Sequence, residues 1–94
     1  MSEVYAVVMK VRLDMDTSRE QRQSVIEEYI VPEYQELPGF QLASWMNDGE
    51  GTGLCLVEFD SEEHARAAVP ALTGHGGPDV TECGVYAVEI QATV

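Results

Sequence analysis

The apolar positions at the start of the chain have a period of two. Residues 4–13 (VYAVVMKVRL) are apolar at every odd position. Their even positions are apolar up to Val8 and basic at Lys10 and Arg12. A strand with one face in water alternates polar residues along its whole length. This segment therefore predicts a long strand with both faces largely buried.

The period changes to that of a helix over residues 18–37. The first apolar stripe of this helix consists of Val25, Ile26, Tyr29 and Ile30. Residues 14–18 supply polar side chains of the kind that cap helices, and Pro32 is expected to kink or split the helix because it lacks an amide donor. Tyr34 lies off the stripe, so the segment after Pro32 is expected to face another surface, such as a partner.

Four further elements follow. They are a strand over residues 40–47, a returning strand over 53–59, a helix over 60–72 and a last strand over 85–94. A glycine-rich turn joins the first two of these strands. Asp60 and Glu63 have the spacing of a capping box, and Pro70 and Gly74 are expected to limit the second helix, so that residues 73–84 form a loop.

The order strand, helix, strand, strand, helix, strand is that of the split βαβ, or ferredoxin-like, fold. The sequence therefore predicts an α+β class domain over residues 1–94. Right-handed crossovers put both helices on one face of a four-stranded antiparallel sheet.

The other face of this sheet is predicted to be apolar as well. Strict alternation along the strands assigns to it Val8, Trp45, Leu54 and Leu56. Monomers rarely expose an apolar patch larger than a few hundred Å². We therefore expect a homodimer in which the two sheets pack face to face, with these four residues in the interface.

Two short motifs support a resemblance to a known group. They are Leu37-Pro38-Gly39-Phe40, before the second strand, and residues 57–65 (VEFDSEEHA), at the start of the second helix. With the element order, they resemble the dimeric α/β-barrel superfamily, which includes the antibiotic-biosynthesis-monooxygenase-like domains. The superfamily holds monooxygenases, heme-degrading enzymes, isomerases and ligand-sensing domains, so the resemblance marks the fold better than the activity.

The resemblance implies a small-molecule cavity lined by aromatic side chains, and an enzyme of this kind often needs no bound cofactor. The heme-degrading branch uses an Asn in its first strand with a Trp and a His elsewhere. The first strand here contains no Asn, so that pattern is not matched. No cofactor is expected.

The charge of the chain restricts its partners. Seventeen acidic and five basic side chains give a formal net charge of −12. Nucleic acids and anionic membrane surfaces are bound through Lys and Arg, so neither is an expected partner. Cys55 and Cys83 fit neither a disulfide scaffold nor a zinc spacing, which favours free thiols and a cytoplasmic protein, with Cys55 as a small core residue.

Few residues of the sequence are candidates for catalysis or for metal binding. His64 is a weak candidate for an acid, base or ligand, although an ordinary surface or boundary histidine is the simpler explanation, and His75 is a weaker candidate. No metal site is expected: Asp14 and Asp16 resemble the start of a calcium loop, but the later positions do not fit one.

Three tyrosines are expected between the sheet and the helices. Together with His64, the candidates for a ligand pocket are Tyr5, Tyr29 and Tyr86. The simpler alternative is that these rings fill the core. Trp45 likewise has two other possible places besides the interface, namely the pocket and the solvent.

Two functions remain open at this stage. One is a cofactor-independent, monooxygenase-like enzyme that acts on an aromatic or polyketide-like small molecule. The other is a non-catalytic module for ligand binding or dimerisation. A cavity of several hundred Å³ with converging polar groups would favour the enzyme, and a closed core would favour the module.

Overall fold

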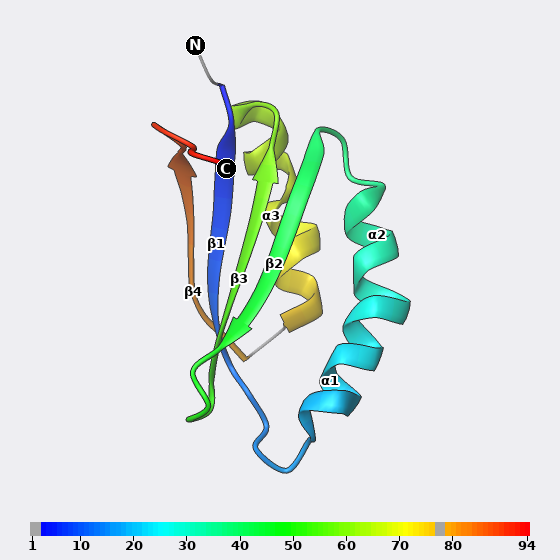
Figure 1. Ribbon diagram of the computed structural model, residues 1–94. Coiled ribbons are helices and arrows are strands. Elements are labelled where there is room, and N and C mark those ends of the chain that lie inside the picture. The colour runs from blue at the N-terminus through cyan, green and yellow to red at the C-terminus, as the bar shows by residue number, and fades with distance from the viewer. Residues whose placement is uncertain (1–2, 77–78) are drawn as a thin grey trace.

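The computed structural model describes residues 3–76 and 79–94, and within them a single four-stranded antiparallel sheet carries the fold (Figure 1). The sheet order is β2-β3-β1-β4. The elements in chain order are β1 (Tyr5–Arg12), α1 (Arg19–Val25), the π-helical segment η1 (Ile26–Ile30), α2 (Val31–Gln35), β2 (Phe40–Asn47), β3 (Thr52–Phe59), α3 (Glu62–Gly76) and β4 (Val80–Ala87). The predicted βαββαβ order and antiparallel sheet are confirmed.

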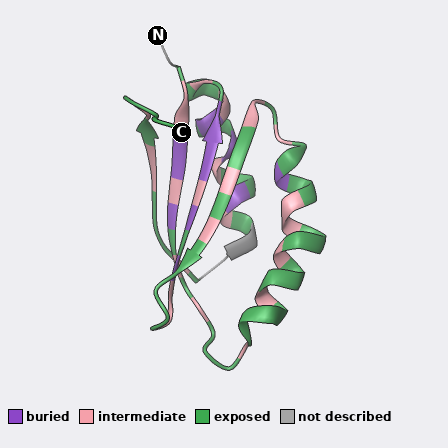
Figure 2. Ribbon diagram, viewed as in Figure 1, coloured by how far each residue is buried: buried purple, intermediate pink, exposed green. Residues whose placement is uncertain are grey.

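Both helical elements pack on the same face of the sheet. The buried core combines one face of β1 and β3 with the inner side of α3 and a single residue of α2 (Figure 2). Its members are Val7, Met9, Tyr34, Cys55, Val57, Phe59, Ala65, Ala68 and Leu72. The small alanines allow α3 to approach the central strands closely.

The start of α1 follows from its local sequence. Ser18 caps the helix, since its hydroxyl oxygen accepts from the Gln21 amide (3.1 Å) and the Gln21 side chain accepts from the Ser18 amide (3.0 Å). Asp14 makes the preceding turn, because its carboxylate accepts from the Asp16 amide. The capping role predicted for residues 14–18 is confirmed.

Pro32 changes the helix rather than ending it. In a regular helix the amide of residue 32 would bond the carbonyl four residues earlier, and proline has no such amide. The chain widens into the π-helical segment η1 just before Pro32, and the Val31 amide bonds the carbonyl oxygen of Ile26, five residues back. A π turn holds more residues than an α turn, so residues spaced by four keep to one face of the helix.

This widening corrects the expectation for Tyr34. Ile26, Ile30 and Tyr34 are spaced by four, and all three line the same cavity beneath the helix. Tyr34 is buried in the core, so the prediction that it faces a different surface is wrong.

α3 is longer than predicted. It begins after Ser61, whose hydroxyl oxygen accepts from the His64 amide (3.2 Å), so Ser61 caps the helix in place of the predicted Asp60. The helix continues through Pro70 and Gly74 to Gly76. The predicted loop over residues 73–84 is therefore wrong at both ends, and its residues 77 and 78 lie outside the described part of the chain.

A β-bulge in β2 turns Trp45 to the helix side. Phe40 lies opposite Phe59, but the register shifts by one residue before Leu42, and Trp45 then lies opposite the buried Cys55. Directly opposite residues share a face, and one extra residue exchanges the faces of everything that follows. The prediction that Trp45 lies on the open face, away from the helices, is therefore wrong, and Leu42 and Met46 lie there instead.

β4 also differs from the prediction. It spans Val80–Ala87 rather than residues 85–94, and Tyr86 lies opposite Ala6, whereas Val85 lies opposite the buried Val7. Val85 packs against the core. The ring of Tyr86 lies over Gly84 on the open face and is 58% exposed, so the expected position of Tyr86 between sheet and helices is wrong.

The chain after β4 leaves the sheet and crosses its open face near β1 (Figure 1). The Val88 amide bonds the Val4 carbonyl oxygen, and the Gln91 side-chain amide donates to the carboxylate of Glu58. Glu58 lies opposite Ala6 and is only 7% exposed. The hydrogen bond from Gln91 therefore satisfies a carboxylate that would otherwise be buried without a partner.

Gly39 connects the helical hairpin to β2 with a positive φ of 78°. A β-carbon at this position would overlap the Asp60 carboxylate and the His64 ring, which are themselves paired at 2.6 Å. Gly49, in the hairpin turn, has nearly the same φ of 76° but open space around it.

We predict that Gly39→Ala lowers the free energy of unfolding by about 2 to 3 kcal/mol, against about 1 kcal/mol for the matched control Gly49→Ala. Alanine at a positive φ destabilises the fold in both variants, and only in Gly39→Ala must the new β-carbon also displace neighbouring side chains. Urea denaturation followed by circular dichroism measures both. Equal losses in the two variants would show that the contact with Asp60 and His64 is absent in solution.

Candidate functional site

A cavity of about 480 Å³ lies between the sheet and the first helical element, with the end of α3 as its floor. Most of its wall is apolar. The apolar residues of the wall are Met9, Val11, Leu13, Val25, Ile26, Ile30, Leu72 and Val80. A volume of this size is typical of sites for small organic molecules.

Two stacked aromatic rings form one side of this cavity. The centroids of Tyr34 and Trp45 are 5.7 Å apart, and their planes differ by 24°. The Tyr34 hydroxyl donates to the Leu72 carbonyl oxygen (3.2 Å), which ties α2 to α3. The bulge in β2 turns the Trp45 ring inward, and the Tyr34 ring lies on the helix face that also carries Ile26 and Ile30.

Burial keeps the Tyr34 hydroxyl protonated. Its pKa is raised well above the usual value for a phenol, mainly by desolvation and also by the nearby Cys55 and Glu33. A neutral phenol whose hydroxyl donates a hydrogen bond to a carbonyl oxygen is a poor general base. Tyr34 therefore shapes the cavity and is not poised to move protons.

Cys55 lies in the cavity wall opposite Trp45 in the sheet. It is a free thiol, as predicted, and burial raises its pKa to about 12. The thiolate is the reactive form of cysteine. Cys55 is therefore an inert part of the wall near neutral pH.

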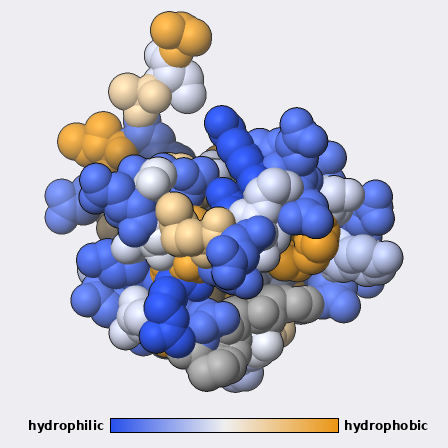
Figure 3. All heavy atoms as spheres, turned by 90° about the horizontal axis from the view of Figure 1, so that it is seen from below, coloured by the Kyte–Doolittle hydropathy of each residue, from blue (hydrophilic) through white to orange (hydrophobic). Residues whose placement is uncertain are grey.

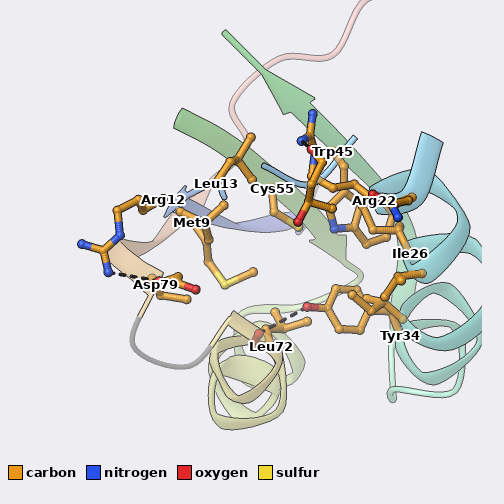
Figure 4. A pocket seen from close by; sticks show the side chains of 16 residues that line it. Met9, Arg12, Leu13, Arg22, Ile26, Tyr34, Trp45, Cys55, Leu72 and Asp79 are labelled. Atoms are coloured by element: carbon orange, nitrogen blue, oxygen red, sulfur yellow. Dashed lines mark hydrogen bonds and ion pairs between the residues drawn. The ribbon is translucent and has the colours of Figure 1, made fainter. Parts of the chain in front are cut away.

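The rim of the cavity carries charge at two places. Figure 4 shows Arg12 and Asp79 on one side of the pocket, and Arg22, Trp45 and Tyr34 on the other. Arg12 is ion-paired with Asp79 (3.0 Å). Arg22 donates from Nη1 to the Thr17 carbonyl oxygen (2.7 Å), which holds its guanidinium in the wall of the cavity.

A second cavity of about 110 Å³ adjoins the first, and the residues that line both are Val11, Leu13, Arg22, Ile26, Trp45 and Cys55. Its other residues come from α1 and from the adjoining ends of β2 and β3. The polar members among them are Arg19, Gln23 and Asn47. The end of the molecule seen from below is mainly hydrophilic, with a few hydrophobic groups between the polar ones (Figure 3).

The pocket residues predicted from the sequence do not come together. Tyr29 is 67% exposed, and Tyr86 lies on the open face. Tyr5 packs against the core, which agrees with the simpler alternative for this residue, and it does not line the cavity.

His64 lies at the start of α3, beyond the end of β3, whereas the cavity lies beside the other end of that strand. Its Nδ1 is 2.6 Å from the Asp60 carboxylate, and its side chain is partly exposed. The structure does not bring His64 to the cavity. The side chain of the second candidate, His75, lies outside the described part of the chain.

The described residues contain no group of three or more His, Cys, Asp or Glu side chains arranged to hold a metal ion. Asp14 and Asp16 serve the turn before α1. Among the helices of the described residues, none combines the length and the apolar character needed to span a bilayer.

Sequence reasoning missed Tyr34 and Arg22 as cavity residues. The spacing of four between Ile26, Ile30 and Tyr34 was a usable signal for Tyr34. Arg22 gave one as well, since it stands four residues before Ile26 and so on the same helix face.

We predict that iodoacetamide at pH 8 modifies the exposed Cys83 and leaves Cys55 unmodified until the protein is unfolded. Desolvation keeps Cys55 as a thiol, and the fold limits access to it. Mass spectrometry of tryptic peptides, with and without urea, measures both sites. Native labelling of Cys55 at the rate of Cys83 would contradict the described cavity wall.

Comparison with known proteins gives a likeness in fold. No protein-family model and no curated protein sequence matches the chain. Among solved structures, the chain is similar to the heme-degrader MhuD from Mycobacterium tuberculosis, a structure with two hemes bound in its active site. The TM-score is 0.60 at 18% sequence identity, over 96% of this chain and 99% of that one. At this identity the likeness shows the fold, and it confirms at that level the resemblance seen in the sequence.

Proposed function

We propose that the protein binds a flat aromatic or polyketide-like small molecule in the 480 Å³ cavity and acts on it as a cofactor-independent, monooxygenase-like enzyme. The observation that carries the proposal is the cavity itself, with the stacked rings of Tyr34 and Trp45 in an otherwise apolar wall. A flat π-system of a ligand can pack on these rings. The likeness in fold to a heme-degrading protein adds support, since that protein also acts on a large planar molecule.

The reaction that suits this cavity is one in which the substrate itself supplies the electrons that reduce O₂. An electron-rich ring with a CH₂ group reacts with O₂ to give a carbonyl group and water, so that one oxygen atom enters the product and the other leaves as water. The substrate supplies both hydrogen atoms and all the electrons. The protein holds the ring and excludes water, as an apolar cavity does.

Heme itself fits the described lining less well. Iron in heme proteins is held by axial ligands such as histidine or cysteine thiolate. The described lining residues include no histidine, and Cys55 is kept as a neutral thiol. The cavity therefore suits a metal-free organic ring better than an iron-bound heme, and no step here depends on iron.

A second candidate function is a non-catalytic ligand-binding module. The absence of a general base among the described lining residues favours it, because Tyr34 and Cys55 stay protonated and Asp79 is paired with Arg12. Both candidates require the same cavity. They differ only in whether O₂ is consumed.

We also propose that the chain forms a homodimer through the open face of its sheet. Val8, Leu54 and Leu56 keep their predicted place on this face. Trp45 is replaced there by Leu42, Met46 and Tyr86, which are all exposed. A standard interface buries on the order of 800 Å² per partner, and these side chains, which spread over all four strands, form the apolar centre that such an interface needs.

Binding and turnover can be tested with dithranol, a small anthrone that O₂ converts to 1,8-dihydroxyanthraquinone and water. We expect the protein to raise the rate of O₂ uptake above that of dithranol alone. Trp45→Leu is expected to lower the enzymatic rate about 10-fold or more, since it removes the stacking surface. Tyr29→Ala is the matched control, because its ring lies in solvent and should not matter.

Thermal shift separates the two candidate functions. A ligand at 100 times its Kd stabilises the fold by about 2.7 kcal/mol, and the module reading predicts this shift without O₂ uptake. If a panel of flat aromatic compounds produced no thermal shift and no O₂ uptake, both candidate functions would be contradicted.

We predict that Leu56→Asp, in the centre of the open face, converts the dimer to a monomer because it puts a charge into the apolar interface. Ala67→Asp, exposed on α3, is the control and should leave the dimer intact. Sedimentation velocity at micromolar concentration measures both variants. A monomeric wild-type chain, or a Leu56→Asp variant that sediments like the wild type, would contradict this interface.

A further inference from the structure

The basic residues of the chain are concentrated at the cavities. The chain has five basic and seventeen acidic side chains. Three of the five, Arg12, Arg19 and Arg22, line the larger cavity, the smaller one, or both. In a protein with a net charge of −12, this placement gathers positive charge around the two cavities, where Asp79 offsets the charge of Arg12.

Arg12 and Arg22 both line the larger cavity, and they differ in the group that each one contacts. Arg12 is neutralised by Asp79 at 3.0 Å. Arg22 donates to a neutral carbonyl oxygen, that of Thr17, and forms no ion pair within the part of the chain that the structure describes. A guanidinium group has five N–H donors, so this single bond positions Arg22 and leaves donors for a ligand.

The smaller cavity offers a place for an acidic group of a ligand whose ring lies in the larger cavity. Arg22 and Trp45 border both cavities, so they stand at the junction between the apolar main cavity and its smaller neighbour. Arg19, Gln23 and Asn47 line only the smaller one. A ring in the main cavity that rests against Trp45 therefore has its edge within reach of a second compartment of about 110 Å³, in whose largely apolar wall Arg22 and these three polar side chains stand.

We propose that the ligand of this site carries a carboxylate group, that Arg22 binds this carboxylate at the junction of the two cavities, and that Arg19 adds a second positive charge. This inference rests on the proposed function, since it takes the flat ring in the main cavity as given. The ligand class becomes that of the aromatic carboxylic acids.

Geometry favours an anion with paired oxygens, such as a carboxylate, over a neutral polar group. The planar guanidinium fork matches the two oxygens of a carboxylate and binds them in a bidentate manner. The strongly acidic surface repels such ligands elsewhere, so a local cluster of arginines is needed to admit one. Binding of an acid is then expected to weaken as salt concentration rises.

The test compares 2-naphthoate with 2-naphthamide, which have the same ring system and differ in charge. Trp45 is the single tryptophan of the chain, so quenching of its fluorescence reports binding directly in the wild type and in Arg22→Gln. We expect the wild type to bind the acid about 10- to 100-fold more tightly than the amide, and Arg22→Gln to lose that preference. Affinity for the amide should not change, which shows that the variant is folded.

Two further variants sharpen the result. Arg22→Lys keeps the charge without the fork and should retain part of the preference. Arg66→Gln, on α3 and paired with Glu62, should leave it unchanged. Equal wild-type affinity for both probes, or an Arg22→Gln variant that still prefers the acid, overturns the inference and leaves the proposed binding of aromatic rings standing. Binding of neither probe overturns both.

Discussion

The contact between the rings of Tyr34 and Trp45 is the interaction on which the site depends. It joins the helical hairpin to the edge strand β2, and it stands at the junction of the two cavities. Local irregularities accompany it on both sides. The bulge in β2 turns Trp45 inward, and a π-helical segment precedes Pro32 in the helix that carries Tyr34. Irregularities of both kinds are common at functional sites.

The sequence was sufficient for the architecture and insufficient for the site, for a physical reason. Element order, the cap before α1, the hairpin turn between β2 and β3 and the apolar patterns of β1 and β3 depend on local chemistry, and the structure confirms them. The assignment of Trp45 and Tyr86 to faces depends on register, and one unpaired residue exchanges the faces of a strand. No composition signal marks the bulge near Gln41, and the predicted pocket therefore gathered residues that the fold keeps apart.

The two apolar surfaces of the sheet have separate roles in this account. The helix side is closed by α3 over one part of the sheet and left hollow beneath α1, where a ligand can enter. In the part of the chain that the structure describes, no helix covers the open side, and the segment after β4 contacts Glu58 through Gln91.

Trp45 lies on the helix side of the sheet against Tyr34, in the wall of the larger cavity. Nuclear Overhauser effects from the indole protons of Trp45 report this position in solution. We expect cross-peaks to the ring of Tyr34 and to the β-protons of Cys55. Cross-peaks to the methyl groups of Leu54 and Leu56 instead would place Trp45 on the open face and would contradict the bulge, the cavity and the function drawn from them.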